Sequence, residues 1–292
     1  MHIILGDTGH VGSATAQALL ERGEPVTVVT HDRSKGEDWM RRGAKVAVAD
    51  VHDVDSLRNI FRQGKRLFLV NPPADPSTDT DAEERKTVAS LVAALEGSGL
   101  EKIVAESTYG AQPGERCGDL CILYDMEQAL HAQSIPATII RAAYYMSNWD
   151  VSLETARTEC VVHTLYPPGF KLPMVAPQDL GQVAARLLTE PVESSGLHYV
   201  EGPERYSPTD AAVAFAHALG KPVQVVAASR EQWKETFKSM GFSEPAAESY
   251  ARMTAISVDE RYSMPESPER GTVSLQHYIS SLVGRDSSTA RQ

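Results

Sequence analysis

Three glycines near the start of the chain follow an apolar run at residues 3–5 and lead into a helical pattern that begins near Val11. Gly6 permits a sharp exit from a strand, Gly9 lets the backbone approach an anion without a Cβ in the way, and Gly12 lets the helix pack close to the strand. The first turn of the helix would then offer unpaired N–H groups to the anion. This order of strand, glycine turn and helix predicts a site for the pyrophosphate of a dinucleotide. The residues expected to line it are Gly6, Thr8, Gly9, His10, Val11 and Gly12.

The residues that follow the second predicted strand, 26–30, bear on which dinucleotide is bound. Arg33 and Lys35, with His31, could hold the 2′-phosphate of NADP. Asp32 could instead bond the ribose hydroxyls of NAD, or the whole segment could be a solvated turn of mixed charge. Because Asp32 falls in a loop between two cations, we expect NADP(H) to be favoured over NAD(H).

Further candidate residues stand where other predicted strands end, because open α/β sheets bind ligands at the carboxyl ends of their strands. These strands are expected at residues 45–50, 66–70, 102–105 and 137–141. The expected cofactor contacts at the strand ends are Thr30, His31, Arg33, Lys35, Asp50, Val51, Asn71, Pro72, Pro73 and Ser107. An aromatic run after the strand at 137–141 is either a seam between two lobes or the wall of a substrate pocket. The expected substrate contacts are Thr108, Tyr144, Tyr145, Asn148 and Trp149.

Three residues near these strand ends could donate or accept a proton in a reaction: Tyr109, Asp119 and Tyr124. Asp119 could act as a general acid or base if burial raised the pKa of its carboxyl group. For each of the three, the plainer interpretation is a structural hydrogen bond or a solvated side chain. The sequence leaves both interpretations open.

The alternation of short apolar runs with helical patterns predicts an α/β fold. We expect a Rossmann-type doubly wound parallel sheet with a smaller C-terminal α/β substrate lobe. Residues 1–150 are expected to form the NAD(P)-binding Rossmann core, to which residues 176–202 return. Residues 151–175 and 203–283 are expected to form the substrate lobe, and the polar residues 284–292 a disordered tail.

The composition of the chain limits its partners. A net charge of −11, from 28 basic and 39 acidic residues, argues against a nucleic-acid partner. We find no run of about 18 apolar residues that would predict a membrane span, and a strand at the N-terminus leaves no signal peptide. We therefore expect a cytoplasmic protein with a small-molecule substrate, and leave open a homodimer or a protein partner. The cysteines, Cys117, Cys121 and Cys160, are too few and wrongly spaced for a disulfide framework or a zinc site, so no metal is expected.

Four segments of the chain carry a family resemblance when they are taken together: the glycine loop and residues 71–73, 124–130 and 141–148. They resemble the NmrA-like family, which belongs to the atypical short-chain dehydrogenases and reductases. Later segments, 201–204 and 220–223, are similar to the C-terminal lobe of that family, so the likeness spans residues 1–260.

The resemblance implies an NADP-preferring Rossmann fold with a substrate cleft between two lobes. Known members include quinone, azo-dye and triphenylmethane-dye reductases, and also redox-sensing regulators that bind the dinucleotide without turning it over. The chain departs from the family at His31, where an arginine is frequent, and at Leu123, where many members carry lysine or histidine four residues before the glutamate matched by Glu127. The Tyr-x-x-x-Lys pair of the superfamily is also missing, because its tyrosine would fall at Asp119 and its lysine at Leu123.

We therefore expect an NADPH-dependent reductase that transfers hydride to a small conjugated or aromatic acceptor, such as a quinone, dye, imine or enone. Hydride transfer needs a reduced nicotinamide held near the acceptor, and these acceptors need little acid help. The missing pair is thus compatible with reduction. Two alternatives stay open: a non-catalytic NAD(P)-binding redox sensor, and a non-redox hydrolase or isomerase on the same scaffold.

Overall fold

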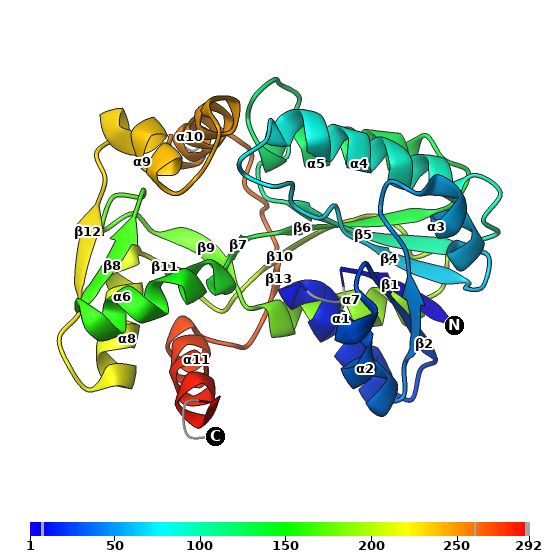
Figure 1. Ribbon diagram of the computed structural model, residues 1–292, viewed down its shortest axis with the longest axis horizontal. Helices are drawn as coiled ribbons and strands as arrows, with labels where there is room; N and C mark the ends of the chain where they lie inside the picture. The colour runs from blue at the N-terminus through cyan, green and yellow to red at the C-terminus, as the bar shows by residue number, and fades with distance from the viewer. Residues whose placement is uncertain (7–8, 260, 290–292) are drawn as a thin grey trace.

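Eight parallel strands make up the central sheet, in the order β13-β10-β6-β5-β4-β1-β2-β3 (Figure 1). The computed structural model describes residues 1–6, 9–259 and 261–289. The strands of this sheet are β1 (His2–Leu5), β2 (Val26–Thr30), β3 (Lys45–Val48), β4 (Arg66–Leu69), β5 (Lys102–Thr108), β6 (Ala137–Ala142), β10 (Leu197–Glu201) and β13 (Glu269–Arg270). The chain builds outward from β1 to β3 and then resumes on the other side of β1 at β4. This reversal is the mark of a doubly wound sheet, so the predicted fold class is confirmed.

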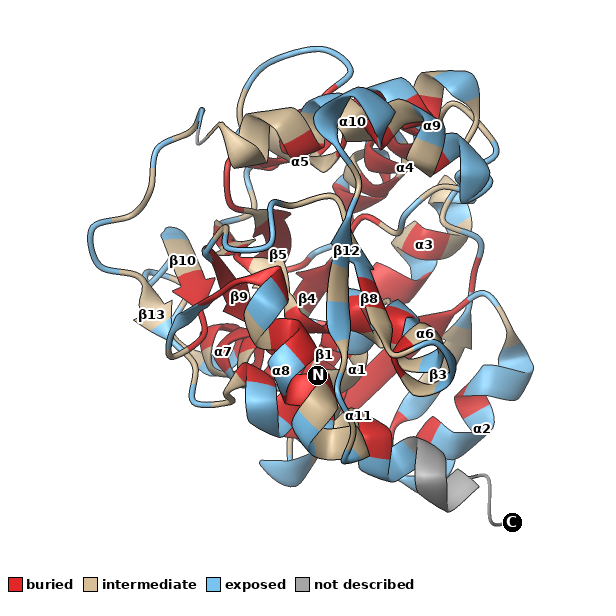
Figure 2. Ribbon diagram, turned by 90° about the vertical axis from the view of Figure 1, so that its left-hand side faces the viewer, coloured by how far each residue is buried: buried red, intermediate tan, exposed pale blue. Residues whose placement is uncertain are grey.

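Helices cover both faces of the sheet (Figure 1). One face carries α1 (His10–Glu21), α2 (Arg33–Arg41) and α7 (Pro177–Thr189), and the other carries α3 (Val54–Phe61), α4 (Thr80–Leu95) and α5 (Asp119–His131). Because side chains alternate along a strand, Ile4 joins the core under α1 and α7 while Ile3 joins the core under α3 and α4. Figure 2 shows the buried residues concentrated in the central strands and on the inward faces of the helices.

The second lobe is built on two small sheets, β11-β9-β7 and β12-β8. Its strands are β7 (Tyr144–Tyr145), β8 (Val161–Thr164), β9 (Leu172–Val175), β11 (Arg205–Tyr206) and β12 (Gln224–Ala227). Its helices are η1 (Met146–Ser152), α6 (Leu153–Thr158), α8 (Pro208–Leu219), η2 (Arg230–Gln232), α9 (Trp233–Ser239), α10 (Glu244–Val258) and α11 (Leu275–Thr289). The lobe has its own core, which includes Trp149, Phe215 and Tyr278. The strand β13 comes from the range expected for this lobe, yet it pairs with β10 at the edge of the central sheet.

The strand β5 is longer than the sequence predicts, since it runs to Thr108 rather than to residue 105. Its pairing with β6 continues to the end, where Thr108 lies opposite Ala142. The apolar run stops at Ala105, which is why the pattern underestimates the strand. As a consequence, Glu106 and Ser107 lie inside the strand and point to opposite faces of the sheet.

The predicted disordered tail, 284–292, is wrong for the residues up to Thr289, because these belong to α11. The first turns of this helix pack Leu275, Tyr278 and Ile279 into the core of the second lobe beside α8. The polar residues at its end continue a helix that this packing stabilises. Residues 290–292 lie outside the described residues.

Two of the three cysteines are paired, which the spacing did not lead us to expect. Cys117 and Cys121 form a disulfide across the entry to α5, with their Cα atoms 5.6 Å apart. The residue between the loop and the helix is Gly118, whose φ of +54° allows the turn that brings the two cysteines together. Cys160 is free and half-buried.

No helix in the described part of the chain is long and apolar enough to span a membrane. Within the described ranges, no group of three or more histidine, cysteine, aspartate or glutamate side chains is placed to hold a metal ion.

Candidate functional site

The glycine loop between β1 and α1 forms a close-packed turn. Gly6 has a φ of +75°, and the N–H of Gly9 donates to its carbonyl oxygen at 2.9 Å. A Cβ on Gly12 would lie 2.2 Å from the same carbonyl oxygen, so glycine is required there. The helix begins after Gly9 without a side-chain cap and without an acidic residue in its first turn, which leaves its N-terminus suited to an anion.

The other residues predicted for the pyrophosphate are placed as follows. Val11 is buried, so it can offer only its backbone to a ligand. The imidazole of His10 is exposed and lies 3.8 Å from the carboxylate of Asp150, across the boundary between the lobes. Thr8 lies outside the described residues.

The segment after β2 shows what each charged residue does. Asp32 caps α2: its carboxylate accepts from the hydroxyl of Ser34 at 2.8 Å and from the backbone N–H of Ser34 at 2.9 Å. These two hydrogen bonds lower the pKa of Asp32. Arg33 and Lys35 stand in the first turn of α2 with exposed side chains. The carboxylate is therefore engaged as a helix cap, while the two cations remain available at a helix N-terminus.

Neighbouring strand ends carry the other predicted cofactor contacts. Thr30 is buried at the end of β2, and the exposed His31 follows it. Asp50 accepts from the N–H of His52 at 2.8 Å within its own turn, next to the half-buried Val51.

Asn71, directly after β4, is buried, and neither atom of its side-chain amide has a hydrogen-bond partner among the described residues. An orphaned buried amide costs stability unless a ligand bonds it, so Asn71 fits a polar group brought by a cofactor. Pro72 and Pro73 continue this wall, half-buried and exposed. The glycine turn, the cations Arg33 and Lys35, and the amide of Asn71 together form a set of groups that fits a phosphorylated dinucleotide.

Ser107, also predicted to contact the cofactor, points to the α5 side of the sheet. Its hydroxyl donates to the carboxylate of Glu127 at 2.5 Å. The same carboxylate receives two hydrogen bonds from the guanidinium of Arg141, at 2.9 and 2.7 Å. Glu127 raises the pKa of Arg141, and Tyr199 accepts a further hydrogen bond from it at 2.9 Å. Ser107 thus belongs to a buried ionic network.

On the opposite face of β5, Glu106 is 4% exposed and forms a pair with Tyr145. The hydroxyl of Tyr145 donates to a carboxyl oxygen of Glu106 at 2.6 Å. Burial raises the pKa of Glu106 to about 7, and the hydrogen bond from Tyr145 only partly offsets it. The pKa of Tyr145 is raised well above its usual value by burial first, then by Glu106 and Asp119.

Three more carboxyl groups meet between α4, α5 and the loop after β4: Asp81, Glu84 and Asp119. Burial, followed by the charges of Asp119 and Asp81, raises the pKa of Glu84 to about 8. Burial and Asp81 raise the pKa of Asp119 to about 6. Glu84 is tied to the loop after β4 by the N–H of Ala74 at 3.1 Å, and Asp81 accepts from Ser249 of α10 at 2.5 Å. This acidic cluster holds protons near neutral pH.

The predicted proton donors are therefore in different situations. Asp119 has the raised pKa that its predicted role requires, and it also acts on Tyr145. Tyr109 is buried and donates to Glu201 at 3.3 Å, and burial raises its pKa. Tyr124 is half-buried on α5.

The aromatic run after β6 packs within the second lobe and also reaches the central sheet, and its role as the wall of a substrate pocket stays a prediction. Trp149 is buried in the core of the second lobe, and Tyr144 meets it edge-on with the ring centroids 6.3 Å apart. Tyr144, whose pKa is raised to about 12 by burial, also meets Tyr166 edge-on at 5.6 Å. Asn148 is exposed and bonds the hydroxyl of Tyr144. Of the four predicted substrate contacts in this run, Tyr145 is the one with a hydrogen bond to a described residue of β5. The fifth predicted contact, Thr108, is the half-buried last residue of that strand.

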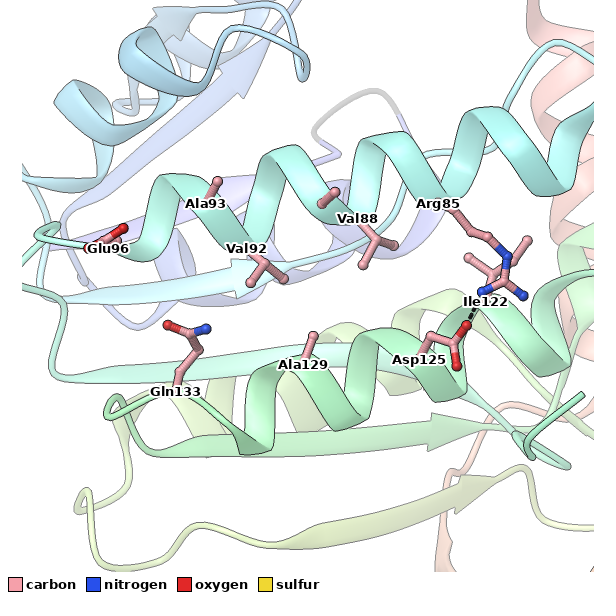
Figure 3. Close-up of a pocket in the computed structure, with 10 residues that line it drawn as sticks. Arg85, Val88, Val92, Ala93, Glu96, Ile122, Asp125, Ala129 and Gln133 are labelled. Carbon is pink, nitrogen blue, oxygen red and sulfur yellow. Dashed lines mark hydrogen bonds and ion pairs between the residues drawn. The ribbon is translucent and has the colours of Figure 1, made fainter.

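A groove of about 740 Å³ runs along α4 and α5, as Figure 3 shows. Its walls are mostly small and apolar, and an ion pair between Arg85 and Asp125 stands at one end. The groove shares no residue with the predicted cofactor, substrate or proton-transfer sets. The groove is therefore separate from the site predicted at the strand ends.

Sequence reasoning missed two residues of this site, Glu84 and Glu106. Each left a signal. Glu84 stands at helical spacing with Val88 and Leu91, so it is an acid on the buried stripe of its helix. Glu106 follows directly on the apolar run of β5, where burial is expected to continue.

Comparison with known proteins bears on the family. A model of the NmrA-like family matches residues 2–288 of the chain. The NAD(P)H azoreductase of Xenophilus azovorans is 24% identical over 256 residues, which are 88% of this chain and 87% of the azoreductase.

Two solved structures share the fold. The triphenylmethane reductase of Citrobacter sp., complexed with NADP(H), has a TM-score of 0.80 and 20% identity, over 97% of this chain and 100% of that chain. The NADPH-dependent quinone oxidoreductase QOR2 of Escherichia coli, complexed with NADPH, has a TM-score of 0.77 and 19% identity, over 97% and 99% of the two chains.

Proposed function

Because the chain belongs to the NmrA-like family, we propose that it is an NADPH-dependent reductase that transfers hydride to a small conjugated or aromatic acceptor. The observation that carries the proposal is the glycine turn, in which a Cβ on Gly12 would collide with the carbonyl of Gly6. Such a turn, ahead of an uncapped helix, suits the pyrophosphate of a dinucleotide. When bound, the reduced nicotinamide supplies the hydride.

The preference for NADP(H) rests on the start of α2. A carboxylate that bonded the ribose hydroxyls would favour NAD, but the carboxylate of Asp32 already caps the helix. Arg33 and Lys35 present two positive charges beside it, as a 2′-phosphate requires.

The acceptor class rests on two residues of α5 and on the relatives named above. Leu123 and Asp119 stand where the superfamily has its lysine and tyrosine, which disfavours an ordinary ketone as substrate. The relatives named above act on an azo compound, a triphenylmethane dye and a quinone, and all of these accept hydride into a conjugated system. We propose an acceptor of this kind.

The test is a turnover screen with purified protein, NADPH and a panel of quinones, azo compounds, cationic dyes, imines and enones. We expect NADPH oxidation with at least one of these classes. NADPH binding without oxidation of any acceptor would contradict the reductase proposal and favour the redox sensor. Turnover of a substrate without any dinucleotide, lost in Asp119→Asn, would favour a non-redox enzyme.

A further inference from the structure

We propose that Tyr145 donates a proton to the acceptor during reduction, and that Glu106 resupplies this proton to Tyr145. The inference rests on the proposed function, because it concerns the proton that accompanies the hydride. Tyr145 would be the catalytic residue, and Glu106 would act through it.

The first observation is the isolation of the pair. The hydroxyl of Tyr145 lies 2.6 Å from the carboxyl oxygen of Glu106. Among the described residues, Tyr145 is the one group that bonds this carboxyl, which is 4% exposed. Tyr145 is half-buried as a residue, and its hydroxyl reaches the buried acid. The hydroxyl thus links a half-buried side chain to an interior carboxyl group, as a proton relay to a bound molecule requires.

The second observation is the position of the pair in the sheet. Glu106 lies near the carboxyl end of β5, between β4 and β6, and Tyr145 follows the carboxyl end of β6. Asn71, with its unpartnered amide, follows the end of β4. Ligands of doubly wound sheets bind at these strand ends, so the pair stands where an acceptor would meet the cofactor.

The third observation is the electrostatic surrounding of the pair. Burial raises the pKa of Glu106 to about 7, so a large fraction of the carboxyl groups carry a proton at neutral pH. Two carboxyl groups act on Tyr145, Glu106 and Asp119, and both raise the pKa of its hydroxyl together with burial. Tyr145 therefore stays protonated, and it can give up its proton only as Glu106 replaces it.

Two of the other candidate donors, Tyr109 and Asp119, are already engaged. Tyr109 donates to Glu201 in the interior, and burial raises its pKa. Asp119 shares the cluster of Asp81 and Glu84, which is closed by the hydrogen bond of Ser249 from α10. In the pair of Glu106 and Tyr145, by contrast, a protonated acid is bonded to the hydroxyl of a half-buried side chain.

The proton transfer balances as follows. Hydride adds to one atom of the acceptor with its electron pair, and negative charge develops on the conjugated oxygen or nitrogen. The O–H bond of Tyr145 breaks as its proton forms a bond to that atom. For this step the hydrogen bond of the pair reverses: the protonated Glu106 carboxyl donates to the Tyr145 oxygen, and the Tyr145 O–H turns to the acceptor. The proton of the Glu106 carboxyl then moves to the Tyr145 oxygen, and the resulting carboxylate is reprotonated from water before the next turnover.

The experiment compares two kinds of acceptor with the same protein. Quinones and azo compounds need a proton with the hydride, whereas a cationic triphenylmethane dye is neutralised by hydride alone. We expect Tyr145→Phe to slow single-turnover reduction of the first kind by roughly 10²-fold, the range for loss of a general acid, and to leave the cationic dye unaffected. Tyr206→Phe, which removes the hydroxyl of another buried tyrosine, is the matched control and should change neither rate.

For Glu106, the variant is Glu106→Gln, whose amide oxygen can still accept from Tyr145. In the unaltered protein, reduction of the proton-requiring acceptor should fall as the pH rises above about 7, because Glu106 loses its proton. This limb of the pH profile should vanish in Glu106→Gln, and the solvent deuterium isotope effect should shrink. Nuclear magnetic resonance of isotope-labelled glutamate side chains should show a carboxyl that titrates near pH 7, besides that of Glu84 near pH 8, and the signal near pH 7 should be missing in Glu106→Gln.

Several outcomes would overturn the inference. Equal losses with both kinds of acceptor would mean that Tyr145 only shapes the site, and no loss with either would mean that it takes no part. If the unaltered protein reduced cationic dyes and no other acceptor, its reaction would need no proton, and a proton donor would have no role. Retained NADPH binding and a single cooperative thermal unfolding transition show that the variants are folded. Turnover of no acceptor by the unaltered protein is a different failure, because it contradicts the proposed function itself.

Discussion

Two buried glutamates lie on either side of one strand, and their surroundings differ. Glu127 of α5, 3% exposed, faces Ser107 on one side of β5 and holds the guanidinium of Arg141. Glu106, 4% exposed, lies in β5 itself and points to the other side, where the hydroxyl of Tyr145 is its one hydrogen-bond partner among the described residues. Glu106 and Ser107 are consecutive, and consecutive side chains of a strand point to opposite faces of the sheet. The ionic network of Ser107 and Glu127 therefore lies on one face, and the neutral acid Glu106 on the other.

The comparison shows that burial alone does not decide the role of a carboxyl group. A buried carboxylate is tolerated where a guanidinium compensates its charge, and such a pair is costly to break. A buried carboxyl without a cation becomes neutral instead, as the raised pKa of Glu106 indicates. The network of Glu127 therefore stabilises the core, whereas Glu106 is able to store a proton.

The largest expected effect comes from removal of the cation. Arg141→Met leaves Glu127 buried without its partner and should lower the free energy of unfolding by about 3–5 kcal/mol. Chemical denaturation measures this loss. In the double variant Arg141→Met with Glu127→Gln, most of the stability should return, because no charge is left uncompensated. Equal stability of the single and double variants would show that the uncompensated charge of Glu127 is not the cause of the lost stability.

A second prediction concerns the pH dependence of Glu106. An unfolded glutamate ionises above its ordinary pKa of 4.5, but folded Glu106 stays neutral up to about pH 7. The unfolded state is therefore favoured increasingly as the pH rises from about 4.5 to about 7. Relative to the unaltered protein, Glu106→Gln should gain stability over this range, on the order of 2–3 kcal/mol, and no more above it.

Thermal unfolding at a series of pH values measures this difference. Glu96→Gln, at an exposed glutamate after α4, is the control and should follow the unaltered protein at every pH. A stability difference that does not change with pH would mean that Glu106 ionises in the folded protein as it does in water.

The smallest effect is expected at Ser107. Ser107→Ala removes one of three hydrogen bonds to the carboxylate of Glu127, while both bonds from Arg141 remain. The free energy of unfolding should fall by about 1 kcal/mol. Since the hydroxyl is turned toward Glu127, the Kd for NADPH should not change. A marked loss of NADPH affinity would instead support the role in cofactor binding that the sequence predicts.

The sequence predicts the cofactor half of the molecule better than the acceptor half, for a physical reason. The turn at Gly6, Gly9 and Gly12 depends on contacts within a few residues. Local patterns carry such information. The span of β2 follows from the same kind of pattern and agrees with the structure.

The acceptor half depends on contacts between elements that are distant in the sequence. Glu106 and Tyr145 come from β5 and from the strand after β6, and Asp81 meets Ser249 of α10. No local pattern specifies that these side chains meet. The helix α10, which closes the acidic cluster, was itself not predicted, because its apolar residues do not form a clear stripe.

The central claim is that the chain binds a phosphorylated dinucleotide at the glycine turn and the start of α2. Calorimetric titration with NADPH and NADH, of the unaltered protein and of the double variant Arg33→Ala with Lys35→Ala, tests it most directly. We predict that the unaltered protein prefers NADPH and that the double variant binds NADPH about 10- to 100-fold more weakly, with little change for NADH. Binding of neither dinucleotide, or equal affinities that the double variant leaves unchanged, would contradict the account.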